Sequence, residues 1–109
     1  MTEGFEPVVR VSDLPLGSLR TVVTPRGKRI CVVHRDDGRI HAIAGVCTHR
    51  HFPLAEGTIL PGDRIECAWH GAQFDLATGA VLGPPAVDPI AVFDVELADG
   101  MVCIRSRAG

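Results

Sequence analysis

Four residues in two closely spaced pairs have side chains that can bind a metal. The first pair is Cys47 and His49, the second is Cys67 and His70, and residues 50–66 separate the two. Thiolate and imidazole ligands favour zinc or an iron–sulfur cluster over hard cations such as calcium and magnesium. The spacings C-x-H and C-x-x-H therefore predict a metal site on which two loops close.

The composition of each pair bears on which metal this is. Zinc fingers usually take two Cys from one segment and two His from another, whereas each segment here supplies one Cys and one His. C-x-H is also a tight spacing for two ligands of a single ion. A two-iron cluster fits better, because the Cys and the His of one loop can then bind different irons, and a structural zinc site stays as the alternative.

This pattern resembles the Rieske family, in which two Cys hold one iron of a 2Fe–2S cluster and two His hold the other. The resemblance covers nearly the whole chain and includes Pro53–Gly57, Gly62–Asp63, Gly71, Phe74–Asp75, Thr78–Gly79 and Pro84–Pro85. It implies one 2Fe–2S cluster per chain, for which Cys47, His49, Cys67 and His70 are both the metal ligands and the cofactor-binding residues.

The chain departs from the Rieske subunits of respiratory complexes in ways that concern the reduction potential. Those proteins carry an extra Cys in each ligand loop, and a Ser and a Tyr after the second His donate hydrogen bonds to sulfur. Here the loops have no extra Cys, the matching positions are Ala72 and Phe74, and the chain has no Tyr. Missing donors leave the reduced cluster less stabilised. The resemblance thus implies a low-potential ferredoxin, at about −150 mV in the Rieske range.

Residues beside the ligands have expected roles of their own. His51 lies two residues after His49 and is expected to be a solvated loop residue, while Arg50 replaces the Gly often found there and offers a charge for docking. Trp69 is expected to pack beside the cluster, with a docking contact as the alternative. Pro84–Pro85 is expected to form a loop that covers the cluster, as in the family.

The remaining candidates for chemistry have structural interpretations. Cys31 and Cys103 lie in strand-like apolar runs, where a Cys usually acts as a small buried hydrophobe. His34 and His41 also lie in such runs and are expected to be ordinary strand residues.

Short alternating runs separated by Gly- and Pro-rich turns predict the elements that position the ligands. Strands are expected over Phe5–Val11, Ser18–Thr24, Lys28–His34, Arg39–Ala44, Gln73–Leu76, Ala80–Leu82, Ile90–Leu97 and Met101–Arg105, with a single helical turn at Pro53–Glu56. Such a pattern predicts an all-β fold, here a Rieske-type antiparallel β-sandwich. We expect a single Rieske domain over 1–109, with a base sandwich at about 1–45 and 87–109 and an inserted cluster-binding subdomain at about 46–86.

Composition limits the function classes. The chain has 109 residues, 46% of them apolar, and a net charge of −2, so nothing points to nucleic acid or to an anionic membrane surface. Residues 1–6 show no signal peptide and no apolar run is long enough to span a bilayer. A soluble, cytoplasmic monomer is expected.

The resemblance implies a ferredoxin with no catalytic residues of its own, which passes single electrons from a flavin-dependent reductase to a terminal oxygenase that hydroxylates aromatic rings. An oxygenase α-subunit would need a further iron domain, for which 109 residues leave no room. Two alternatives stay open, namely the small Rieske-like subunit of an assimilatory nitrite reductase and a zinc-stabilised interaction module.

The ligand assignment makes a prediction that separates His49 from its neighbour His51. Replacing His49 or His70 by Ala is expected to abolish cluster assembly, because the binding energy of a metal site is also folding energy. His51→Ala is expected to keep the cluster. Visible absorbance and iron content of the three purified variants test this, and a colourless His51→Ala beside a coloured His49→Ala would show that the register is wrong.

Overall fold

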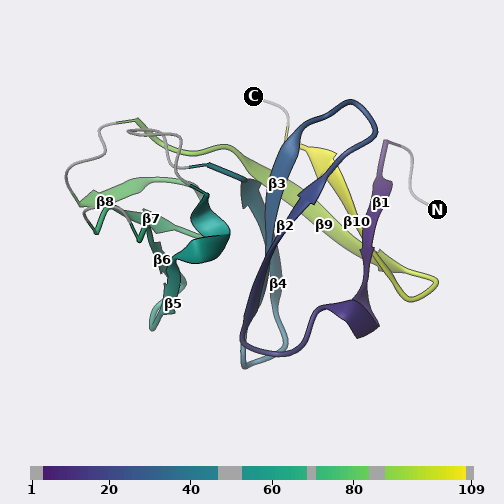
Figure 1. Ribbon diagram of the computed structural model, residues 1–109, viewed down its shortest axis with the longest axis horizontal. Coiled ribbons are helices and arrows are strands. Elements are labelled where there is room, and N and C mark those ends of the chain that lie inside the picture. Colours follow the sequence, from purple (N-terminus) through teal and green to yellow (C-terminus); the bar gives the residue numbers. More distant parts are fainter. Residues whose placement is uncertain (1–3, 47–52, 69–70, 84–87, 108–109) are drawn as a thin grey trace.

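The computed structural model describes residues 4–46, 53–68, 71–83 and 88–107. Within these residues it contains ten β-strands and two short 3₁₀ turns (Figure 1), which are β1 (Glu6–Arg10), η1 (Val11–Asp13), β2 (Ser18–Val23), β3 (Arg29–His34), β4 (Ile40–Ala44), η2 (Leu54–Glu56), β5 (Thr58–Leu60), β6 (Arg64–Glu66), β7 (Gln73–Asp75), β8 (Val81–Gly83), β9 (Val92–Ala98) and β10 (Met101–Ser106). No helix in this described part is long and apolar enough to cross a membrane.

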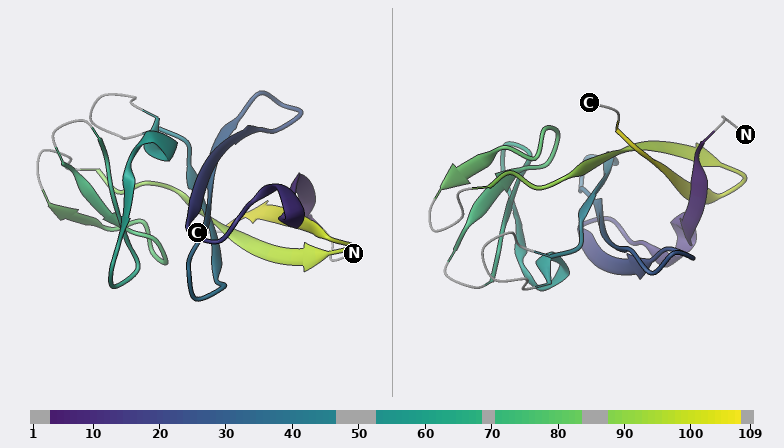
Figure 2. Two further views of the ribbon diagram at one scale, coloured as in Figure 1. Left: turned by 60° about the horizontal axis from the view of Figure 1, so that its bottom comes forward. Right: turned by 90° about the horizontal axis from the view of Figure 1, so that it is seen from above.

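The strands form two antiparallel sheets. One has six strands in the order β1-β10-β9-β4-β3-β2, and the other has four in the order β5-β6-β7-β8. Figures 1 and 2 show them as two lobes, with the chain entering the four-stranded sheet after β4 and returning to the six-stranded sheet at β9. The predicted all-β antiparallel fold class is confirmed, while the division into a base sandwich and an inserted subdomain stays a prediction.

Strand β3 lies between two hydrophobic cores. Ile30 and Val32 point into a core within the six-stranded sheet, and Cys31 and Val33 point into a core shared with the four-stranded sheet. All four side chains are fully buried. A strand covered on both faces reads as a continuous apolar run, which explains the sequence Ile-Cys-Val-Val. Thus β3 joins the two halves of the molecule.

Most predicted strands are present within a residue or two of their expected ends, and Pro53–Glu56 contains the expected single turn as η2. Strands β5 and β6 were not predicted. Each has three residues, too short for an alternation of apolar and polar residues to stand out. At the start of the last hairpin the strand begins at Val92 rather than Ile90, because the Ile90 amide donates to the carbonyl of Gly79 at 2.9 Å.

The β7–β8 turn has the predicted chemistry. The Asp75 carboxylate accepts hydrogen bonds from the amides of Thr78 at 2.9 Å and Ala77 at 2.8 Å, and these bonds lower the pKa of Asp75. Gly79 has φ = +80°, and a Cβ there would collide with the Ile90 carbonyl. The turn is therefore fixed against the segment that leads into β9.

An ion-pair cluster joins the β3–β4 turn to the β5–β6 turn. Asp63 Oδ1 lies 3.0 Å from Arg35 Nη1 and 2.9 Å from Arg39 Nη2. The Arg35 side chain is only 13% exposed, whereas that of Arg39 is 56% exposed. Asp63 has φ = 59°, and its carbonyl accepts the Leu76 amide at 2.7 Å. One residue thus links three turns from both sheets.

Removing this carboxylate is expected to destabilise the fold. Asp63→Ala leaves the mostly buried Arg35 without its closest carboxylate, which costs about 1–3 kcal/mol. The expected result is a lower urea midpoint for the cluster-loaded protein, followed by circular dichroism. Asp13→Asn, an exposed change in η1, is the control and should alter stability by less than about 0.5 kcal/mol. Equal midpoints for the two variants would contradict the role given to Asp63.

Candidate metal centre

The first ligand loop is closed at its base by backbone contacts. Val46 and Pro53 form an antiparallel bridge, and the Leu54 amide donates to the Gly45 carbonyl at 3.0 Å. These contacts bring together the two ends of residues 47–52, which contain the predicted ligands Cys47 and His49. Both ligands lie outside the described residues, as do Arg50 and His51. The structure therefore defines where this loop starts and ends.

The second ligand loop is the end of the β6–β7 hairpin. Glu66 pairs with Gln73 across the two strands, and the Cys67 amide donates to the Ala72 carbonyl at 2.7 Å. Gly71 has φ = +74°, a conformation that glycine adopts readily and that turns the chain back. Predicted ligand Cys67 is described, whereas Trp69 and predicted ligand His70 lie outside the described residues, as does Pro84–Pro85.

The bases of the two loops lie side by side. Thr58 pairs with Glu66 in the β5–β6 ladder, and a Cβ on Gly57 would collide with the Glu66 carbonyl. Leu54 and Cys67 are buried in the same hydrophobic core. Figure 1 shows η2 between the two sheets, where it also contacts β2 and β3. The residues that flank the two predicted ligand segments are thereby brought to one region of the molecule.

The surroundings of Cys67 suit a metal-bound thiolate. The residue is 1% exposed, and Leu54, Ala72 and Phe74 in the same core are 0% exposed. A negative charge in such apolar surroundings is costly unless a neighbouring charge compensates it, and metal coordination deprotonates a thiol outright. The donor set of two thiols and two imidazoles also matches a Rieske cluster. The residues present therefore fit a 2Fe–2S centre.

The two other described cysteines have the predicted packing role. Cys31 is 0% exposed and Cys103 is 1% exposed, and neither forms a disulfide. Burial raises the pKa of the Cys31 thiol to about 12 and also raises that of Cys103. Their thiols thus stay neutral at ordinary pH and pack as small apolar groups, as predicted.

The histidines outside the loops are strand residues, as predicted. His34 ends β3, with its Nδ1 lying 2.7 Å from the Leu14 carbonyl oxygen. His41 lies in β4, where burial lowers its pKa. Among the described residues no group of three or more His, Cys, Asp or Glu side chains could hold a metal ion.

Two polar residues beside Cys67 were missed in the sequence. Glu66 and Gln73 flank the hairpin end, and Gln73 Nε2 donates to Glu66 Oε2 at 3.2 Å. Their side chains alternate with the buried Ile65, Cys67, Ala72 and Phe74. That alternation is visible in the sequence, but the pairing of the two strands is needed to see that Glu66 and Gln73 meet.

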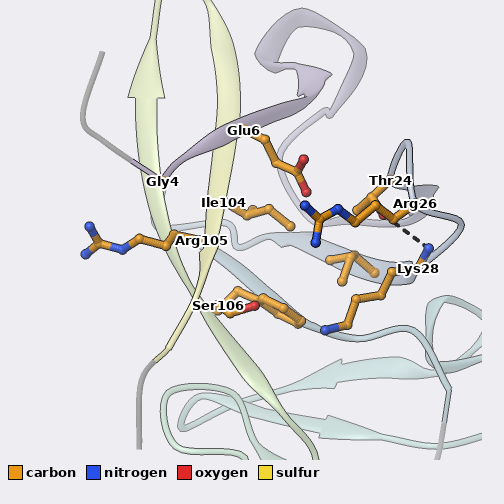
Figure 3. A pocket seen from close by; sticks show the side chains of 10 residues that line it. Gly4, Glu6, Thr24, Arg26, Lys28, Ile104, Arg105 and Ser106 are labelled. Atoms are coloured by element: carbon orange, nitrogen blue, oxygen red, sulfur yellow. Dashed lines mark hydrogen bonds between the residues drawn. The ribbon is translucent and has the colours of Figure 1, made fainter.

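A hollow of about 350 Å³ lies at one end of the six-stranded sheet. Figure 3 shows Glu6 and Arg26 extending toward one another at its edge, while Arg105 points away. The Lys28 ammonium lies 4.9 Å from the centre of the Phe93 ring, which it partly covers. None of the residues that line the hollow comes from 53–68 or 71–83, so it is separate from the candidate metal centre.

Comparison with known proteins supports the same interpretation. Residues 4–94 match the family model described as Rieske [2Fe-2S] domain. The chain is 37% identical to Ferredoxin CarAc of Metapseudomonas resinovorans over 107 residues, which covers 98% of both proteins. It also resembles a chain of the solved complex of reduced oxygenase and oxidised ferredoxin in carbazole 1,9a-dioxygenase, with a TM-score of 0.83, 32% identity and coverage of 99% and 100%.

A second kind of relative is much longer. The chain is 36% identical to Apoptosis-inducing factor 3 of Mus musculus over 91% of its own length, but it spans only 16% of that protein. Domains similar to this chain therefore occur both as short ferredoxins and as a small part of larger proteins.

The position of Ala72 makes the predicted effect of a missing hydrogen-bond donor testable. Ala72 is opposite Cys67 in the hairpin and is buried in the same core. In Ala72→Ser, a hydroxyl donor there is expected to stabilise the more negative, reduced cluster. A hydrogen bond to a charged group contributes at most about 1.5–3 kcal/mol, and 59 mV corresponds to a tenfold change for one electron. Protein-film voltammetry should therefore show a rise of up to about 130 mV.

Ala80→Ser, in the exposed β7–β8 turn, is the control and is expected to leave the potential unchanged. Phe74→Tyr adds the second donor, although Phe74 is fully buried and a phenol there needs a partner. A wild-type potential well above zero, or an Ala72→Ser protein with an intact cluster and the wild-type potential, would show that the missing donors do not set the potential.

Proposed function

Because the chain belongs to the Rieske [2Fe-2S] family, we propose that it is a ferredoxin that delivers single electrons to a terminal oxygenase. The observation that carries the proposal is the likeness of nearly the full chain to Ferredoxin CarAc over nearly that protein's full length. The likeness to a chain in a solved oxygenase–ferredoxin complex supports an oxygenase as the acceptor. A flavin-dependent reductase is the proposed donor, and aromatic-ring hydroxylation is the proposed reaction of the acceptor.

We assign the cluster ligands residue by residue. Cys47 and Cys67 hold one iron, and His49 and His70 hold the other, in the manner of the family. The adjacency of the two loop bases supports this assignment. The cluster supplies one-electron chemistry when bound. Two thiolates and two neutral imidazoles leave its oxidised form uncharged, so an electron is added more readily than to a four-thiolate cluster.

The chain's own residues have positioning roles in this proposal. The apolar core around Cys67, including Leu54 and Phe74, excludes water from the thiolate side. The hydrogen bond from the Cys67 amide to the Ala72 carbonyl fixes the backbone position of Cys67, from which its side chain extends. In this proposed role no residue acts as an acid, a base or a nucleophile. The protein would carry electrons without catalysing a reaction of its own.

Paired cysteine variants test the cofactor assignment. Cys67→Ser is expected to lose about two irons and two acid-labile sulfides per chain, whereas Cys103→Ser is expected to keep them. Both cysteines are 1% exposed, so the pair separates a ligand from a packing residue. One zinc and no labile sulfide in the wild-type protein would favour the zinc module and overturn the proposal.

Electron delivery is tested with the loaded wild-type protein. After anaerobic reduction by dithionite, it is mixed with the terminal oxygenase of a carbazole 1,9a-dioxygenase system or with an assimilatory nitrite reductase. Oxidation of one electron equivalent per chain by the oxygenase is expected, read as recovery of visible absorbance. Rapid oxidation by nitrite reductase alone would instead favour the alternative subunit role.

A further inference from the structure

Three polar side chains form a row on the half-buried face of the β6–β7 hairpin. Arg64 Nη1 donates to Gln73 Oε1 at 3.3 Å, and Gln73 Nε2 donates to Glu66 Oε2 at 3.2 Å. The Arg64 Nε also donates to the Pro61 carbonyl at 3.0 Å. A neutral amide therefore lies between a fixed positive charge and a fixed negative charge.

The negative end of this row lies toward the second ligand loop. Glu66 directly precedes Cys67, and a Cβ on Gly71 would lie 3.8 Å from Glu66 Oε2. The carboxylate is thus held against the end of the hairpin by Gln73. Arg64 is two residues farther from Cys67, and its bond to Pro61 holds it at the β5–β6 turn.

We propose that this row sets part of the cluster's reduction potential, with Glu66 lowering it and Arg64 raising it. The inference rests on the proposed function, because it needs the cluster at the two ligand loops. Reduction adds one negative charge to the cluster, and a fixed carboxylate nearby makes that addition less favourable, while a fixed guanidinium makes it more favourable. Arg64 has the smaller effect because it lies farther from the loop.

The expected shifts have opposite signs. Glu66→Gln keeps the shape and a hydrogen-bonding oxygen but removes the charge. We expect the equilibrium constant for reduction of the cluster to rise threefold to tenfold, which raises the reduction potential by about 28–59 mV. Arg64→Gln is expected to lower it by about twofold, or about 18 mV. Opposite shifts from two neighbouring substitutions distinguish a charge effect from a structural disturbance. A structural disturbance would not follow the sign of the charge that each substitution removes.

The test is protein-film voltammetry of the cluster-loaded proteins at pH 7, in low and in high salt. Matched controls are Glu6→Gln in β1 and Arg20→Gln in β2, which make the same charge changes on exposed positions of the six-stranded sheet. They are expected to leave the potential unchanged. Added salt should reduce the shifts of Glu66→Gln and Arg64→Gln, since it screens charges at half-exposed positions.

Iron and sulfide content of every variant shows whether the cluster is intact. Equal shifts in the control variants, shifts of the same sign for Glu66→Gln and Arg64→Gln, or an unchanged potential in Glu66→Gln would each overturn the inference. If the Glu66→Gln protein does not assemble the cluster, Gln73→Leu replaces it in the test. Gln73→Leu removes the amide that holds the Glu66 carboxylate, and an unchanged reduction potential in that variant would overturn the inference. A wild-type protein without labile sulfide would overturn the proposed function instead.

Discussion

The four-stranded sheet is built from strands of three residues each, at the short end of the range for globular proteins. Its inner face packs against Cys31, Val33 and Ile43 of the six-stranded sheet, in one shared core. The candidate metal centre depends on this contact, because Leu54 and Cys67, which lie at the bases of the two predicted ligand loops, are buried in that same core. The face of β3 and β4 that carries Cys31, Val33 and Ile43 thus supports the bases of both loops.

Backbone geometry then places the loops within that frame. Gly57 allows the segment after η2 to approach the Glu66 carbonyl more closely than any other residue would permit, and the Val46–Pro53 bridge closes the first loop on the same side. The Asp63 cluster and the β7–β8 turn fix to the scaffold the end of the small sheet that lies opposite the β6–β7 hairpin end. The ligand loops therefore emerge from a support that is held at several points.

The features best predicted from the sequence were the closely spaced metal-binding residue types, the long alternating strands and the clear turns. The C-x-H and C-x-x-H pairs indicated the cofactor, and long alternating strands such as β9 and clear turns such as that at Asp75 were predicted correctly. Strands β5 and β6 were not predicted, because three residues are too few to show an alternation of apolar and polar side chains. The Arg64–Gln73–Glu66 row escaped for another reason, since it arises from strand register between residues that the local sequence does not connect.

The pairing of β4 with β9 has a consequence for how the protein is made. Ala42 lies opposite Phe93, and the whole four-stranded sheet is encoded between them. Contacts between residues far apart in sequence form slowly and only after the intervening chain is available. On the ribosome, which adds residues from the N-terminus, the six-stranded sheet is complete only after β9 and β10 are made, because β4 pairs with β9 and β1 pairs with β10. The last hairpin therefore has to come back across the finished four-stranded sheet to close the scaffold on which that sheet packs.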